Sequence, residues 1–171
     1  IFKSEYRNAT WTHPSGLTNN FSPDGSDVMG MDMAMSSGGD AVIAYTMNDG
    51  VNDQVYLSEY RSGSWSHPSG LSDYISLDGV LFNPSVGMTP TGETIVTWAQ
   101  SDPVTGRAML KSEYRNGAWV HPSSIANDKF SGTITMSLYP KVSVGSGGEA
   151  VITWVAFNDA SETQIFKSEY R

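Results

Sequence analysis

The stretch that decides the fold is Ser4-Glu5-Tyr6-Arg7, followed after three residues by Trp11-Thr12-His13-Pro14-Ser15. The same pattern returns at residues 58–69 and 112–123, and a last half-copy, Ser168-Glu169-Tyr170-Arg171, ends the sequence. The copies begin at residues 4, 58, 112 and 168, which are 54, 54 and 56 residues apart. A period of this length is typical of solenoids, propellers and other repeat architectures. The repeat therefore predicts the architecture before any local pattern does.

The composition excludes two classes of partner. The 171 residues include 10 Lys+Arg against 18 Asp+Glu, a formal net charge of -8. Proteins that bind nucleic acid or anionic membranes usually carry a basic face instead. No apolar run approaches the ~20 residues of a membrane-spanning helix. We therefore expect neither a nucleic-acid partner nor a membrane partner.

The absence of cysteine and the other residue frequencies bear on chemistry and location. Without cysteine the sequence offers no disulfide, no thiolate nucleophile and no Cys-type zinc site. Few lysines, five Trp and eight Tyr suit a secreted or surface-displayed bacterial β-protein. The sequence begins inside a repeat at Ile1, so it can be a piece of a longer propeller.

The middle repeat predicts four short strands and little else. They cover residues 84–89, 94–100, 108–114 and 118–121, and Asn116-Gly117 is a strong hairpin signal between the last two. The equivalent runs elsewhere are 29–35 and 141–144, 41–47 and 150–156, and 55–60 and 165–170, with an outer pair at 1–7 and 11–14. No helical apolar period persists for three turns. Four antiparallel strands per repeat predict an all-β fold made of propeller blades.

The second strand of each repeat is apolar on both faces. Ile43, Val96 and Ile152 share one face, and Val42, Ile95 and Val151 share the other. A strand that is apolar on both faces is usually buried on both faces. We therefore expect the sheets to stack side by side, as blades do.

With these features the chain resembles the β-propeller superfamily over nearly its whole length. The hairpin element is also similar to the Asp-box of sialidase-type propellers, Ser-x-Asp-x-Gly-x-x-Trp. Ser112 and Trp119 keep the outer spacing, but Tyr114 stands where the Asp belongs and Gly117 is one place late. The resemblance implies the position of the hairpin and not membership of the sialidases, whose arginine cluster and nucleophilic Tyr are not recognisable here.

Three repeats are fewer than the ~4 to 8 blades of known propellers. We divide the chain into an outer segment, 1–17, and blades at 18–71, 72–125 and 126–171, the last without its own fourth strand. The spare strands at the beginning match the missing strand at the end. We therefore expect two chains to close a six-bladed ring by strand exchange, as a homodimer. The copies of Ile-Phe-Lys-Ser-Glu-Tyr-Arg at the two ends cannot both occupy one place.

The repeated aromatic and charged residues have two interpretations. Repetition within one chain favours a structural role, because every blade has the same packing to achieve. Trp11, Trp65 and Trp119 are then packing anchors, and the charges of the Glu59–Arg61 type keep the blade edges soluble. The alternative is a sugar site in each blade, with an exposed Trp as the stacking platform.

The variable loops are the second candidate site. We expect the loops at 16–27, 70–83 and 124–137 to share one face with those at 48–53, 101–107 and 157–163. The aspartates that we assign to a ligand site on this acidic face are Asp24, Asp49, Asp78, Asp102, Asp128 and Asp159. Such loops could hold Ca²⁺, although neither EF-hand nor nonapeptide spacing is present. Solvated turn carboxylates are the simpler interpretation.

Other chemistry finds less support in the sequence. His13, His67 and His121 occupy equivalent positions in separate repeats, so one shared metal ion is geometrically implausible. The motifs of serine hydrolases, zinc proteases and phosphate loops are missing. We therefore expect a non-catalytic binding or scaffold protein that recognises a glycan or a protein and needs no cofactor. The alternatives are a glycoside hydrolase or lyase with carboxylates on the loop face, and a recently amplified array that serves mainly for assembly.

Overall fold

The computed structural model describes residues 1–79 and 81–171, and it is almost entirely β-structure. Val80, in the predicted loop 70–83, lies outside the described residues. The strands are β1 (Glu5–Arg7), β2 (Thr10–Thr12), β3 (Val28–Met35), β4 (Ala41–Asn48), β5 (Asp53–Arg61), β6 (Ser64–Ser66), β7 (Leu81–Met88), β8 (Thr94–Asp102), β9 (Gly106–Arg115), β10 (Ala118–Val120), β11 (Leu138–Val144), β12 (Ala150–Phe157) and β13 (Thr163–Tyr170). The only helical turns in these ranges are a 3-10 turn at Leu17–Asn19 and α1 at Ile125–Asp128. The predicted strands are confirmed, most of them one to three residues longer than expected.

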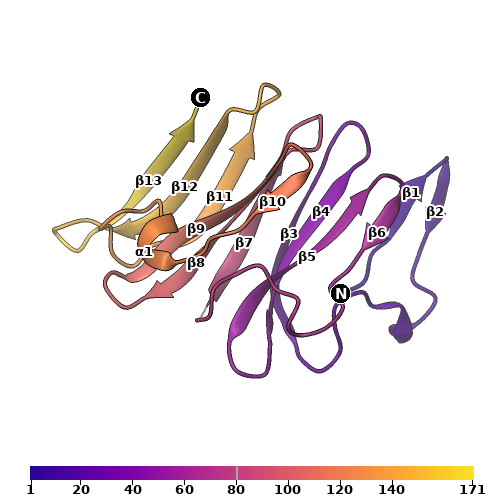
Figure 1. The fold of residues 1–171 in the computed structure, drawn as a ribbon, viewed down its shortest axis with the longest axis horizontal. Coiled ribbons are helices and arrows are strands. Elements are labelled where there is room, and N and C mark those ends of the chain that lie inside the picture. The colour runs from indigo at the N-terminus through magenta and orange to yellow at the C-terminus, as the bar shows by residue number, and fades with distance from the viewer. Residues whose placement is uncertain (80) are drawn as a thin grey trace.

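The strands form four antiparallel sheets, each built from neighbours in the sequence. Their orders are β1-β2, β3-β4-β5-β6, β7-β8-β9-β10 and β11-β12-β13. In Figure 1 the sheets stand side by side, with indigo β1 and β2 at one end and yellow β13 at the other. The strand β7 lies between β3 and β11, so the first strand of each sheet is the one nearest the neighbouring sheets.

Tight turns set the register of the outer strands. Asn116 and Gly117 have φ values of 53° and 81°, and Ser62 and Gly63 have 52° and 85°. Two consecutive residues with positive φ make the two-residue turn that matches the twist of a β-hairpin. The hairpin predicted from Asn116-Gly117 is therefore confirmed, and Ser62-Gly63 forms the same turn without the favoured Asn.

The sheets pack face to face through apolar side chains. On one side of the central sheet, Val96 and Trp98 pack with Val42 of the first four-stranded sheet. On its other side, Ile95 and Ala99 pack with Ile152 of the last sheet. Burying a side chain of this size contributes roughly 1.5–3 kcal/mol. The two-sided burial predicted for the second strands is thus confirmed for β4 and β8.

The same prediction is wrong for β12 in the single chain. Its burial alternates, and Val151 is 39% exposed where the equivalent Val42 is 0% exposed. The physical reason is that no described sheet lies beyond the last one, so nothing covers the outer face of β12.

The two sets of variable loops lie on the same face, as predicted. Gln54 Nε2 donates to Asp49 in the β4–β5 turn and to Asp78 in the loop before β7, both at 3.1 Å. Lys129 Nζ likewise reaches Asp102 Oδ2 at 2.6 Å from the loop after β10. Within the described ranges no helix is long and apolar enough to cross a membrane.

Candidate binding grooves between the sheets

The repeated Trp and Glu join each sheet to its neighbour. Trp65 Nε1 donates to Glu5 Oε1 at 2.7 Å, and Trp119 Nε1 donates to Glu59 Oε1 at 2.8 Å. In both pairs the Trp lies on the last strand of a sheet and the Glu on the sheet before it. A hydrogen bond to a charged acceptor is roughly twice as strong as one between neutral groups.

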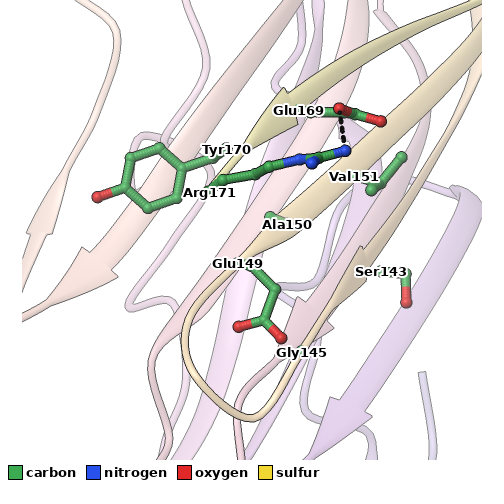
Figure 2. Close-up of a pocket in the computed structure, with 8 residues that line it drawn as sticks. All are labelled: Ser143, Gly145, Glu149, Ala150, Val151, Glu169, Tyr170 and Arg171. Atoms are coloured by element: carbon green, nitrogen blue, oxygen red, sulfur yellow. Dashed lines mark hydrogen bonds and ion pairs between the residues drawn. The ribbon is translucent and has the colours of Figure 1, made fainter.

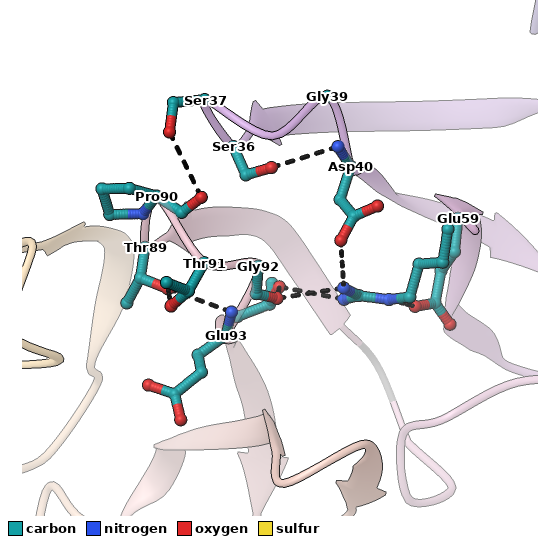
Figure 3. Close-up of polar contacts among 12 residues, drawn as sticks. Ser36, Ser37, Gly39, Asp40, Glu59, Thr89, Pro90, Thr91, Gly92 and Glu93 are labelled. Atoms are coloured by element: carbon teal, nitrogen blue, oxygen red, sulfur yellow. Dashed lines mark hydrogen bonds and ion pairs between the residues drawn. The ribbon is translucent and has the colours of Figure 1, made fainter. Parts of the chain in front are cut away.

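The repeated Arg makes a second contact across the same gap. The Arg7 guanidinium lies 3.5 Å from the centre of the Tyr60 ring, and Arg61 lies 3.7 Å from that of Tyr114. Arg61 Nη1 also donates to Gly92 O at 3.0 Å, in the turn that Figure 3 shows beside Ser37, Gly39 and Asp40. We call this Trp–Glu and Arg–Tyr pair of contacts the inter-sheet lock. The interpretation of the Glu and Arg residues as edge solubilisers is therefore wrong, because they bond to the neighbouring sheet.

Three equivalent grooves open along the sheets, each bounded by a Glu, a His-Pro pair and a loop residue. Groove 1, of about 490 Å³, is lined by Glu5, His13, Pro14, Asn19, Phe21 and His67 among others. Groove 2, of about 200 Å³, is lined by Glu59, His67, Pro68, Asp73, Ile75, Trp119 and His121 among others. Groove 3, of about 430 Å³, is lined by Glu113, His121, Pro122, Asn127, Asp128 and Phe130 among others. The repeat thus places one groove per copy.

Flat aromatic stacks line the grooves. His67 contacts both Phe21 and Trp65, with ring centres 5.0 Å and 5.6 Å away, and Phe21 and Trp65 are 6.4 Å from one another. Trp119 and His121 stack in the same way at 5.7 Å. The imidazoles are oriented locally, since His121 Nδ1 is 3.0 Å from Ser112 Oγ. His67 Nδ1, by contrast, is buried and has no hydrogen-bond partner among the described residues.

Two of the groove carboxyl groups, Glu5 and Glu113, have a lowered pKa. Partial burial raises the pKa of Glu5, but hydrogen bonds from Lys3, Trp65 and Arg7 outweigh it and lower the pKa to about 2. Burial likewise raises the pKa of Glu113, and the hydrogen bonds and charges of Lys111 and Arg115 lower it overall. An ionised carboxylate accepts hydrogen bonds and cannot serve as a general acid near neutral pH.

Groove 3 differs from the other two because it has one wall fewer. The far wall of groove 2 is Trp119 and His121 of the next sheet, and that of groove 1 includes His67 of the next sheet. The residues that line groove 3 all come from the central sheet and the loop after it. The last sheet has no fourth strand in the described ranges, and so no Trp or His in that position.

The three predicted Trp residues have two different environments. Trp65 and Trp119 are partly buried and bonded across the inter-sheet gap, which is the packing-anchor interpretation. Trp11 is 58% exposed and stacks only on its own hairpin, 5.4 Å from Tyr6 and 5.6 Å from His13. Of the three, Trp11 is the exposed one, while the partly buried Trp119 also lines groove 2.

The structure does not gather the six predicted aspartates into one site. Asp49 accepts from the backbone of Val51 and Asn52, and Asp128 accepts from the backbone of Ser123 and Ser124. Asp102 is buried and bonded to Lys129 and Thr105. The exposed members are Asp24, which accepts from Asn20, Asp78, which accepts from Tyr74, and Asp159 in the turn after β12. Only Asp128 lines a groove, and the ligand role of all six stays a prediction.

No group of three or more His, Asp or Glu within residues 1–79 and 81–171 is arranged to hold a metal ion. His13 and His67 both line groove 1, His67 and His121 both line groove 2, and His121 also lines groove 3. Sequence reasoning did not identify them, or the repeated Glu, as groove residues. The available signal was that a Glu, a Trp and a His recur together in every complete copy, which adjacent strands bring to one inter-sheet gap.

Comparison with solved structures supports a propeller-like fold. A fucose lectin from Kordia zhangzhouensis, solved with methyl-fucoside, is 9% identical with a TM-score of 0.50, and the match covers 82% of this chain and 96% of the lectin. An endo-arabinase from Bacteroides thetaiotaomicron is 12% identical with a TM-score of 0.56, covering 94% of this chain and 61% of that one. An α-L-arabinofuranosidase from Lactobacillus brevis is 14% identical with a TM-score of 0.51, covering 92% and 56%. No family model and no curated protein matches the chain.

Proposed function

We propose that the protein is a non-catalytic glycan-binding scaffold whose ligands occupy the grooves between its sheets. The observation that carries the proposal is the repetition of one groove, with a Glu, a His-Pro pair and a polar loop, in each copy. Similar sites at regular intervals suit a polymer or a cluster of identical sugars, since linked sites raise avidity without any new contact. The lectin and the two hydrolases matched above act on or bind carbohydrates, which agrees with this class of ligand.

The chemistry of the grooves favours sugar hydroxyls. Glu5 and Glu113 accept hydrogen bonds, and the stacked Trp119 and His121 offer a flat face of the kind that packs against a sugar ring. Glu5 is oriented by Trp65, Glu113 by Lys111 and Arg115, and His121 by Ser112, so little ordering entropy is lost on binding.

Binding is better supported than catalysis. A glycoside hydrolase needs a carboxylic acid that is protonated at working pH, beside a second carboxylate. The pKa of Glu5 is about 2, and the groove-lining residues of groove 1 include Asn19 where groove 2 has Asp73. A carbohydrate-active enzyme is the alternative, and it would have to use Glu59 with Asp73, because the pKa values of Glu113 and Asp128 are both lowered.

The finer architecture belongs to the same proposal. We place the outer segment at 1–17 and the blades at 18–71, 72–125 and 126–171, and we propose that two chains close a six-bladed ring. The hairpins stand in the position of a degenerate Asp-box. A secreted or surface-displayed bacterial protein suits a glycan-binding role. A protein ligand on the loop face, or an array kept mainly for assembly, would use the same scaffold.

The decisive experiment is a glycan array with and without Ca²⁺, followed by calorimetric titration of the best ligand. We expect more than one site per chain and no hydrolysis of the matching polysaccharide. Asp73→Ala, in groove 2, should lower the number of sites or their affinity, whereas Asp24→Ala, on the loop face outside the grooves, should not. Equal loss from both variants would move the site to the acidic loop face. Turnover of the polysaccharide would establish the enzyme instead.

A further inference from the structure

Two residues of the Trp–Glu type lack the matching contact among the described residues: Trp11 in the first hairpin and Glu113 in the central sheet. Glu5 and Glu59 each accept an indole N–H, but Glu113, in the equivalent position, accepts only from Lys111 and Arg115 among the described residues. Trp11 occupies the position of Trp65 and Trp119, and its Nε1 forms no hydrogen bond to the described residues. Among the described residues, one indole donor, Trp11, and one carboxylate acceptor, Glu113, are therefore left without a Trp–Glu contact.

The sheet faces at the two ends are also uncovered. At the beginning, Met29, Met31, Met33 and Met35 of β3 are each more than half exposed. At the end, Ile165 of β13 is 78% exposed, while the equivalent Met109 of β9 is 0% exposed because it packs against the last sheet. Both end faces are apolar, and inside the chain each such face is covered by the next sheet.

The C-terminal face carries a cavity where the internal sheets make their Arg–Tyr contact. It measures about 170 Å³, and Figure 2 shows Glu149, Val151, Glu169 and Arg171 around it. The side chain of Arg171 is 83% exposed and, within residues 1–79 and 81–171, bonds only to Glu169, whereas the equivalent Arg61 reaches Tyr114 and Gly92 of the next sheet. Arg115 of the central sheet lies 4.9 Å from the centre of the Tyr170 ring, yet Tyr170 is still 60% exposed and its strand β13 is the edge of the last sheet.

We infer that groove 3 is shared between two copies of this chain: the Trp11 indole of a second copy donates to Glu113, and its His13 forms the missing wall. The inference rests on the proposed self-association and specifies its contact. The second copy is the occupant because its first hairpin carries the Trp and His that the internal sheets use in the same position. Tyr6 pairs with Trp11 as Tyr60 pairs with Trp65, and Ser168-Glu169-Tyr170-Arg171 repeats the edge on which such a hairpin forms.

The contact also holds whichever copy of the end strand is used. If β2 of the second chain pairs with β13, or if the whole β1–β2 hairpin replaces the end of β13, Trp11 arrives beside Glu113 in both arrangements. Groove 3 then gains the aromatic wall that groove 2 has in Trp119 and His121. Each closed pair of chains would hold two such shared grooves.

The test is the self-association of the 171-residue chain, measured by sedimentation equilibrium, with Trp11→Phe and Glu113→Gln. Each variant should weaken the dimer roughly tenfold or more, because a charge-assisted hydrogen bond is lost at each of two interfaces. Glu59→Gln is the matched control, since its indole partner lies in the same chain. Far-ultraviolet circular dichroism and the thermal midpoint establish that each variant is folded.

A mixture of the two variants isolates the pair itself. Combining Trp11→Phe chains with Glu113→Gln chains leaves one interface intact and one with both changes, so the mixed dimer should be tighter than either variant alone. A mixture no tighter than its components would overturn the inference, and so would a wild-type chain that stays monomeric at every concentration. A dimer that binds no glycan would contradict the proposed function but not the contact between Trp11 and Glu113. A dimer that neither variant weakens would contradict that contact but not the proposed function.

Discussion

The central sheet and the last sheet are built from equivalent strands, yet they differ in how much of each strand is buried. All residues of β8 but one are buried, whereas β12 alternates between buried and open positions. The less buried strand, β12, is in fact the more apolar of the two, so the difference lies in whether a further sheet covers the outer face of each strand. Burial here is therefore a property of the gap between two sheets and not of the strand. Stability should concentrate at these gaps, as in other repeat proteins.

The largest expected effect tests this difference directly. Met109→Ala in the central sheet should lower the free energy of unfolding by about 2–5 kcal/mol, because it leaves a cavity in a covered gap. Ile165→Ala, at the equivalent position of the last sheet, should cost less than about 0.5 kcal/mol in the monomer. Urea unfolding at low protein concentration measures both. Equal losses would mean that the outer face of β13 is covered after all.

A smaller effect concerns the loop face. Burial raises the pKa of Asp102, but Lys129, Thr105 and the Val104 amide lower it to about 2. A carboxyl with a depressed folded pKa stabilises the fold above its unfolded pKa of ~3.9, and that contribution disappears as the pH falls through about 2. It is worth up to about 2 kcal/mol at neutral pH. Unfolding curves of wild type and Asp102→Asn should differ at pH 7 and converge toward pH 2. A constant difference over that range would assign the loss to packing.

The smallest effect lies in the first gap between sheets. Burial lowers the pKa of His67, aided by the charge of Lys3 and opposed by that of Glu5. The neutral form is favoured in the fold, so its contribution is present above the unfolded pKa of ~6.5 and is lost as the pH falls below it. His67→Phe, which keeps the stack on Phe21 and Trp65, should flatten the decline in stability between pH 7 and 5. His13→Phe, at the exposed equivalent, is the control. An unchanged slope in His67→Phe would place the titrating group elsewhere.

Much of the fold could be predicted because the signals are local and repeated. The hairpin at Asn116-Gly117 and the β-branched second strands can each be predicted from a few adjacent residues. The features that could not be predicted depend on partners far apart in the sequence. Glu59 and Trp119 are 60 residues apart, and the charged pattern around Glu59 fits an exposed edge as well as an inter-sheet bond.

In the candidate site, too, local features could be predicted and contacts between distant residues could not. Trp65 and Trp119 can be recognised as packing anchors because every repeat needs one, whereas the grooves they border cannot. Asp49 and Asp128 stand out as acidic loop residues, but their side chains accept from nearby backbone amides and so shape the turns. Composition identifies an acidic loop, but it does not show which carboxylate oxygen atoms already accept hydrogen bonds from the backbone.

The two uncovered ends of the chain are different from one another: methionines and Trp11 at one, Glu113 and the open side of β13 at the other. A contact between unlike surfaces is heterologous, so it has a direction and repeats until the rotation between chains closes a circle. If the contact relates neighbouring chains by half a turn, two chains close a ring and each uncovered end is buried against the other chain. If the rotation between neighbouring chains does not divide a full turn evenly, the same contact produces a filament that lengthens with concentration.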